Sequence, residues 1–131
     1  MDMRVNNKEK MKLVMVGNGM AGVRAIEELL KLAPDLYDIT VFGAEPHPNY
    51  NRILLPSILD GSQSVEAVTL NPLAWYAKND IKLHAGVRAV QIKRFAKLVF
   101  GADGSVEPYD KLILATGSRP YIPPIEGLKL A

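Results

Sequence analysis

Three glycines in the pattern G-x-G-x-x-G, residues 17–22, follow a short apolar run near the start of this chain. The run, residues 12–17 (KLVMVG), has the unbroken hydrophobicity of a parallel strand buried on both faces. Residues 20–32 have helical periodicity, and residues 37–43 (YDITVFG) have the pattern of a second strand. This order predicts a right-handed βαβ unit, which directs the chain to the α/β class.

Each glycine of the pattern has a physical role in a turn that binds a dinucleotide. Gly17 permits the tight turn out of the strand, Gly19 lets the backbone approach a pyrophosphate, and Gly22 lets the helix pack close to the strand. The helix N-terminus adds unpaired N–H groups and the positive end of its dipole. An ordinary glycine-rich turn is the alternative, and the strand–turn–helix context favours the dinucleotide.

The residue that would bind the ribose is less clearly marked. A dinucleotide site of this kind uses an acidic residue after the second strand, and the first one here is Glu45. Its carboxylate is a candidate acceptor for the ribose hydroxyls, and a solvated loop carboxylate is the alternative.

The rest of the chain is predicted to complete a parallel sheet with a β-meander excursion. Residues 44–61 read as a long loop with one helical turn, and residues 71–80 as a short helix with Asn71 as N-cap and Pro72 at N1. On the first helix, Arg24 with Glu28 and Glu27 with Lys31 are expected to pair. Further strands are expected at residues 81–86, 88–93, 97–100, 107–109 and 109–117.

Composition excludes several classes of site. The chain has no cysteine and only two histidines, so thiolate metal sites, iron–sulfur ligation and disulfides are excluded within it, and no metal site is expected. No Ser/His/Asp set or carboxylate pair indicates a catalytic residue. The net charge of +2 gives no sign of nucleic-acid binding. No segment has the ~20 apolar residues of a membrane span, so a cytoplasmic protein is expected.

Two further segments carry a resemblance to a known family. Residues 109–127 (YDKLILATGSRPYIPPIEG) resemble the ATG motif of the two-dinucleotide-binding-domain flavoproteins, which are similar to pyridine nucleotide-disulfide oxidoreductases. Residues 39–59 (ITVFGAEPHPNYNRILLPSIL) resemble the large subunit of NAD(P)H-dependent nitrite reductase. The resemblance extends from about Lys12 to Gly127 and implies FAD as the cofactor.

The resemblance also implies roles for particular residues. Backbone groups of Asn18, Met20 and Ala21 would contact the phosphates, and Ala89 would lie beside the adenine. Thr116 and Gly117 would approach the flavin. Ser57 stands where many relatives have a lysine near the flavin. Arg52 is therefore the remaining cationic residue that could contact the cofactor, and the alternative is that it is a surface arginine of a loop.

The implied function is that of an FAD-binding portion of an oxidoreductase, which passes electrons from NAD(P)H to a downstream redox centre. Residues 1–11 are expected to be a disordered tail and residues 12–131 a partial, truncated FAD-binding domain, inactive alone and open to self-association. The remainder of the parent enzyme or a redox partner would complete it. A rubredoxin or ferredoxin reductase, an NADH oxidase, a turn that holds NAD(P), and a non-catalytic Rossmann-like module without FAD are the alternatives.

Overall fold

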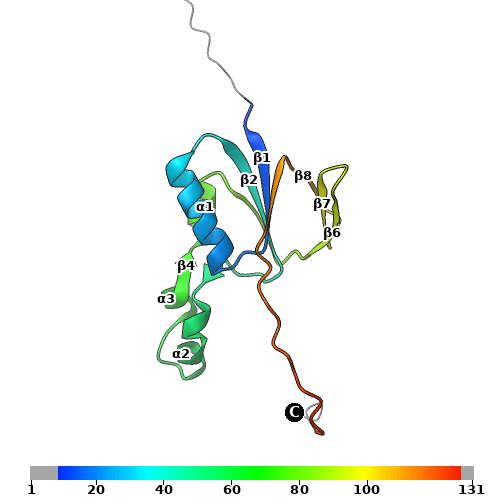
Figure 1. Cartoon of the computed structure of the whole chain (residues 1–131). Coiled ribbons are helices and arrows are strands. Elements are labelled where there is room, and N and C mark those ends of the chain that lie inside the picture. The colour runs from blue at the N-terminus through cyan, green and yellow to red at the C-terminus, as the bar shows by residue number, and fades with distance from the viewer. Residues whose placement is uncertain (1–8, 128–131) are drawn as a thin grey trace, which may run out of the picture.

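A four-stranded parallel sheet forms the centre of the protein, in a computed structural model that describes residues 9–127 (Figure 1). Its strand order is β5-β2-β1-β9, and every neighbouring pair is parallel. The strands are β1 (Met11–Val16), β2 (Tyr37–Gly43), β5 (Lys82–Ala85) and β9 (Lys111–Leu114). The predicted α/β class and parallel sheet are confirmed. Of the tail predicted for residues 1–11, residues 1–8 lie outside the described residues, and Met11 already belongs to β1.

The sheet is covered on both faces, which explains the unbroken apolar run of β1. Helix α1 (Met20–Leu32) lies on one face, where its Val23 and Ile26 pack with Met15 of β1. On the other face, Val14 of β1 packs with Val99. Val99 belongs to the predicted meander, which is formed by β6 (Ala89–Lys93), β7 (Leu98–Gly101) and β8 (Val106–Pro108). Alternate residues of one strand therefore supply two hydrophobic cores.

A partly buried carboxylate joins the meander to the parallel sheet. Glu107 of β8 receives contacts from Lys82 and from Nε2 of His84, the latter at 2.7 Å. The His84 ring stacks on Phe42 with 4.6 Å between ring centroids. Burial alone would raise the pKa of Glu107, but the hydrogen bonds from Lys82 and His84 lower it overall. The carboxylate therefore stays ionised and joins β5 to β8.

Residues 44–80 form more structure than the predicted loop and helix. The elements are β3 (Asn49–Tyr50), η1 (Arg52–Leu54), α2 (Leu55–Leu59), α3 (Val65–Val68), β4 (Thr69–Asn71) and α4 (Leu73–Lys78). Strands β3 and β4 pair antiparallel. The N-cap prediction for α4 was wrong, because Pro72 occupies the cap and Asn71 is a buried residue of β4.

The charged face of α1 confirms one predicted pair and corrects the other. Arg24 contacts Glu28 at 2.7 Å as predicted. Lys31 pairs with Glu28 rather than Glu27. The Glu27 carboxylate instead contacts Arg24 at 3.0 Å and accepts the Asn71 amide of β4 at 2.9 Å. Exposed pairs of this kind contribute little to stability. Within residues 9–127, no helix is long and apolar enough to cross a membrane.

Candidate dinucleotide-binding site

A cleft of about 490 Å³ opens at the carboxyl ends of β1, β2 and β9. The chain passes from β1 to β2 on one side, and β9 lies on the other side of β1. This reversal of strand order is the place where open α/β sheets bind ligands. The volume is typical of small-molecule sites, which span about 300–1,000 Å³. The lining residues are Gly17, Asn18, Gly19, Gly43, Ala44, Glu45, His47, Pro48, Tyr50, Arg52, Arg88, Ala115, Thr116, Gly117, Ser118 and Arg119.

Gly17 and Gly22 are required by the protein itself. Gly17 has φ +110°, and a Cβ there would overlap the backbone of Ala115, whose carbonyl carbon would be 2.6 Å away. Its N–H donates to the Phe42 carbonyl at 2.8 Å, which fixes the turn to the end of β2. A Cβ on Gly22 would lie 2.7 Å from Sδ of Met15. Both glycines thus serve the tight turn and the close helix–strand packing expected of them.

Gly19 is different, because the space around it is open. It is the N-cap of α1 with φ −96°, and a Cβ built there meets nothing within 4 Å. That side chain would project from the lining of the cleft instead of into the protein. The first turn of α1 has no acidic residue, and N–H groups of a first turn have no partner within the helix. The turn therefore fits an anionic group such as a pyrophosphate.

Glu45 is held in the cleft by two neighbours. The Tyr50 hydroxyl donates to its carboxylate at 2.6 Å, and the Arg52 guanidinium forms an ion pair with its other oxygen. Arg52 also lies 5.1 Å from the centroid of the Tyr50 ring. The hydrogen bond from Tyr50, followed by that from Arg52, holds the pKa of Glu45 below its ordinary value. At neutral pH the site therefore presents a fixed, ionised acceptor.

The Tyr50→Phe substitution should raise the pKa of Glu45 toward its ordinary value of 4.5, because the largest cause of the lowering is removed. In the native protein, the contacts of Tyr50 and Arg52 with the Glu45 carboxylate stabilise the fold at pH values above the pKa of Glu45 in the unfolded chain. This contribution is lost as the pH falls through the lower pKa of Glu45 in the folded protein. A ¹³C NMR titration of the Glu45 carboxyl carbon measures the shift. An unchanged midpoint in Tyr50→Phe would contradict the assignment.

Two further arginines line the cleft, Arg88 and Arg119, and sequence reasoning assigned a role to neither. Arg88 precedes β6, in a segment docked against the end of β2. The Val87 N–H donates to the Gly43 carbonyl and the Gly86 N–H to the Glu45 carbonyl, each at 2.9 Å. Arg119 follows the ATG motif. Together with Arg52 they give the cleft a cationic lining that suits an anionic ligand.

The remaining predicted residues divide into two groups. Thr116 and Gly117 line the cleft, directly after Ala115, whose backbone lies against Gly17. Met20, Ala21 and Gly22 form the first turn of α1 and are not among its lining residues, so their backbone contacts to phosphate stay a prediction. Ala89 packs against the second core cluster, and its neighbour Arg88 lines the cleft instead. Residues 9–127 contain no cluster of three His, Asp or Glu side chains suited to a metal ion.

A parallel sheet with a glycine turn at its switch point and a meander on one face defines a dinucleotide-binding protein of the Rossmann type. The chain belongs to the pyridine nucleotide-disulphide oxidoreductase family, whose sequence profile matches residues 11–131. This confirms the predicted resemblance to that group of flavoproteins.

Two individual proteins of one organism are also similar to this chain. The chain is 52% identical over 118 residues to nitrite reductase [NAD(P)H] of Bacillus subtilis (strain 168), covering 90% of this chain and 15% of that protein. It is 50% identical over 119 residues to the assimilatory nitrate reductase electron transfer subunit of the same organism, covering 91% of this chain and 15% of that protein. The chain therefore spans about 15% of the length of these relatives.

A solved structure shows the same arrangement of elements. The covalent putidaredoxin reductase–putidaredoxin complex superposes with a TM-score of 0.80 at 30% identity. The match covers 89% of this chain and 28% of the solved chain. The predicted Rossmann-like fold is confirmed by this likeness.

Proposed function

We propose that this chain is the FAD-binding portion of an NAD(P)H-dependent flavoprotein oxidoreductase of the nitrite reductase type. The observation that carries the proposal is the open space at Gly19 inside a cleft at the switch point of the sheet. The protein itself does not require a glycine there, whereas a pyrophosphate drawn close to the backbone does. The high identity to nitrite reductase [NAD(P)H] supports the choice among flavoproteins.

The cleft residues would bind and orient the dinucleotide. The α1 N-terminus and the cleft arginines would neutralise the pyrophosphate, and Glu45 would accept hydrogen bonds from ribose hydroxyls. Thr116 and Gly117 would lie at the flavin end. When bound, FAD would supply the redox chemistry, with NAD(P)H as reductant and a downstream redox centre as acceptor. None of these residues needs to exchange a proton for that role.

The partner of this portion is proposed to be the remainder of a larger enzyme. In a parent enzyme of the nitrite reductase type, the terminal acceptor would be the nitrite-reducing centre. A rubredoxin or ferredoxin reductase or an NADH oxidase is the second candidate for the parent enzyme.

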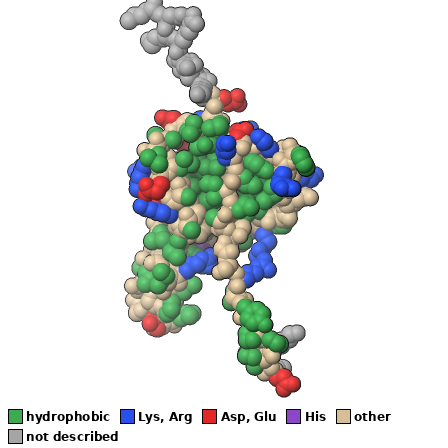
Figure 2. Space-filling view, viewed as in Figure 1, with side chains coloured by type: hydrophobic (Ala, Val, Ile, Leu, Met, Phe, Trp, Pro, Cys, Tyr) green, Lys and Arg blue, Asp and Glu red, His purple; other side chains and the backbone are tan. Residues whose placement is uncertain are grey.

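Strand β9 lies at one edge of the sheet, and Leu114 at its end is 62% exposed. Figure 2 shows hydrophobic side chains gathered on the face of the molecule where β9 lies. Self-association through this edge is a further proposal, which light scattering over a concentration series tests.

Titration of the purified chain into FAD, followed by quenching of flavin fluorescence, tests the proposed function. Saturable quenching with one site per chain is expected, and NAD or NADP should compete only weakly. Preferential binding of NAD(P) would replace FAD as the ligand. If neither dinucleotide bound, the chain would be a Rossmann-like module without a cofactor.

A further inference from the structure

The hydroxyl of Tyr76 lies behind the glycine turn and joins it to another part of the fold. Tyr76 is on α4, is 2% exposed, and its ring belongs to the core between the sheet and α1. Its hydroxyl donates to Oδ1 of Asn18 at 2.7 Å and accepts the backbone N–H of Asn49 at 3.3 Å. Asn18 is the middle residue of the Gly17–Gly19 turn. One buried hydroxyl therefore connects α4, β3 and the turn.

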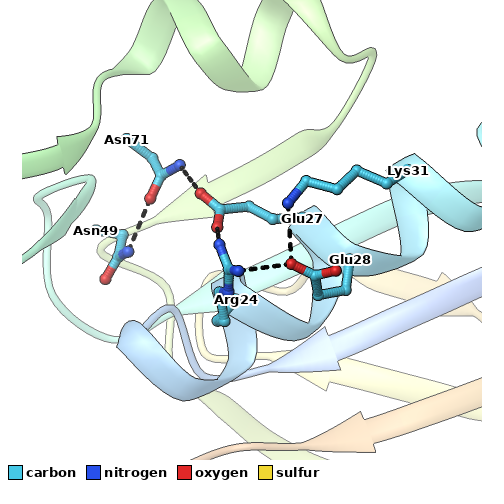
Figure 3. A network of polar contacts seen from close by, with 6 residues as sticks. All are labelled: Arg24, Glu27, Glu28, Lys31, Asn49 and Asn71. Carbon is cyan, nitrogen blue, oxygen red and sulfur yellow. Dashed lines mark hydrogen bonds and ion pairs between the residues drawn. The ribbon is translucent and has the colours of Figure 1, made fainter.

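The same contacts continue from β3 to α1 (Figure 3). The Asn49 amide donates to Oδ1 of Asn71 at 2.8 Å, and the Asn71 amide donates to Glu27 at 2.9 Å. Glu27 lies on α1, the helix that begins immediately after the turn. The turn is thus tied to α1 twice, once through the chain and once through Tyr76 and the two buried asparagines.

Asn18 transmits this constraint to the backbone because its side chain is short and enclosed. Its Cβ packs over the end of β2, where a Cβ built on Gly43 would be only 3.0 Å away. Its Nδ2 is buried and has no hydrogen-bond partner among the described residues. In the described structure, the Tyr76 hydroxyl is accordingly the group that fixes this side chain by a hydrogen bond. Fixing both ends of so short a side chain restricts the peptide groups on either side of it.

We propose that Tyr76 is a positioning residue for the dinucleotide site, whose hydroxyl holds Asn18 and the Gly17–Gly19 backbone in the conformation that receives a pyrophosphate. The hold on the turn is a property of the fold alone, whereas its consequence for a ligand rests on the proposed function. Because the Tyr76 ring is itself core, the hydroxyl can be removed while the packing of the ring is kept.

The first test compares Tyr76→Phe with Tyr37→Phe in the chain without ligand. Tyr37 packs against the same core but stands at the start of β2, away from the cleft. The hydrogen-exchange rates of the Gly17 and Met15 N–H groups are measured by NMR. The ratio of the Gly17 rate to the Met15 rate reports opening of the turn relative to β1. Loss of one hydrogen bond should raise this ratio about three- to tenfold in Tyr76→Phe, and Tyr37→Phe should leave it unchanged. An unchanged ratio in Tyr76→Phe, or an equal rise in both variants, would overturn the proposal.

A second variant tests the same hydrogen bond if Tyr76→Phe fails to fold. Asn18→Ala removes the acceptor and should raise the same ratio by a similar factor. The double variant should add little beyond either single change, because both remove one interaction. Fully additive effects would show that the two side chains act separately and would also overturn the proposal.

The ligand test uses ADP and adenosine, which differ by the group that the turn receives. Tyr76→Phe should weaken ADP binding about three- to tenfold and change adenosine binding by less than about twofold. A merely structural role would weaken both ligands equally, which would count against positioning. If the wild-type chain bound neither ADP nor FAD, the proposed function would fail, while the exchange ratio would still decide the role of Tyr76.

Discussion

Replacement of Gly17 by alanine should lower the free energy of unfolding by about 3 kcal/mol or more, the largest effect expected at the glycine turn. A non-glycine residue at φ +110° costs about 1–3 kcal/mol in backbone strain. In addition, the new Cβ would overlap the backbone of Ala115, which follows β9 and is held by a 2.8 Å hydrogen bond from its N–H to the Val16 carbonyl of β1. Urea unfolding followed by circular dichroism measures the change.

Gly104→Ala is the matched control for this substitution. Gly104 also has positive φ, +86°, but a Cβ there meets nothing within 4 Å. The free energy of unfolding of Gly104→Ala should therefore fall by the backbone cost alone, about 1–2 kcal/mol. If Gly17→Ala and Gly104→Ala destabilised the protein equally, the close approach of the turn to Ala115 would not be a determinant of stability.

Gly19→Val should have the opposite profile, with binding lost and the fold kept. The added side chain meets no protein atom within 4 Å of its Cβ, so the stability should fall by no more than about 1 kcal/mol, the cost of a poor N-cap. The same side chain occupies the space proposed for the pyrophosphate. The affinity for FAD should then fall at least about tenfold, since a lost contact of 1.4 kcal/mol already has that effect.

Ala25→Val supplies the comparison for Gly19→Val. Ala25 is an exposed residue of α1, outside the cleft, and the substitution again introduces a valine. Fluorescence titration should show FAD affinity close to that of the native chain for Ala25→Val. Native affinity in Gly19→Val as well would mean that the pyrophosphate does not approach this turn.

The elements that sequence analysis predicted well are those encoded by neighbouring residues. Helix α1 begins and ends where predicted because the glycine turn, the apolar periodicity and Pro34 all act locally. Strands β3 and β4 are different, since they are short and far apart in sequence. They are joined by the buried Asn49–Asn71 hydrogen bond, for which no local pattern exists.

The candidate site shows the same division. Gly17, Gly19, Glu45 and the Thr116–Gly117 turn were predicted from motifs, and the structure brings them to one cleft. The contacts that hold these residues in place could not be predicted from motifs. The Tyr50 contact to Glu45 depends on how the loop after β2 folds back, and Arg88 enters the cleft only because its segment docks on Gly43 and Glu45. Such contacts are set by tertiary packing and leave no spacing in the sequence.

The central claim is that one FAD molecule occupies the cleft between the glycine turn and the segment after β9. An ¹H–¹⁵N NMR titration of the native chain with FAD tests it most directly. Saturable shifts should gather at Gly17–Gly19, at Glu45 and at Thr116–Gly117, while the β6–β7 hairpin around residues 94–97 stays unchanged. Shifts confined to that hairpin, or no saturable shifts at any FAD concentration, would contradict the account.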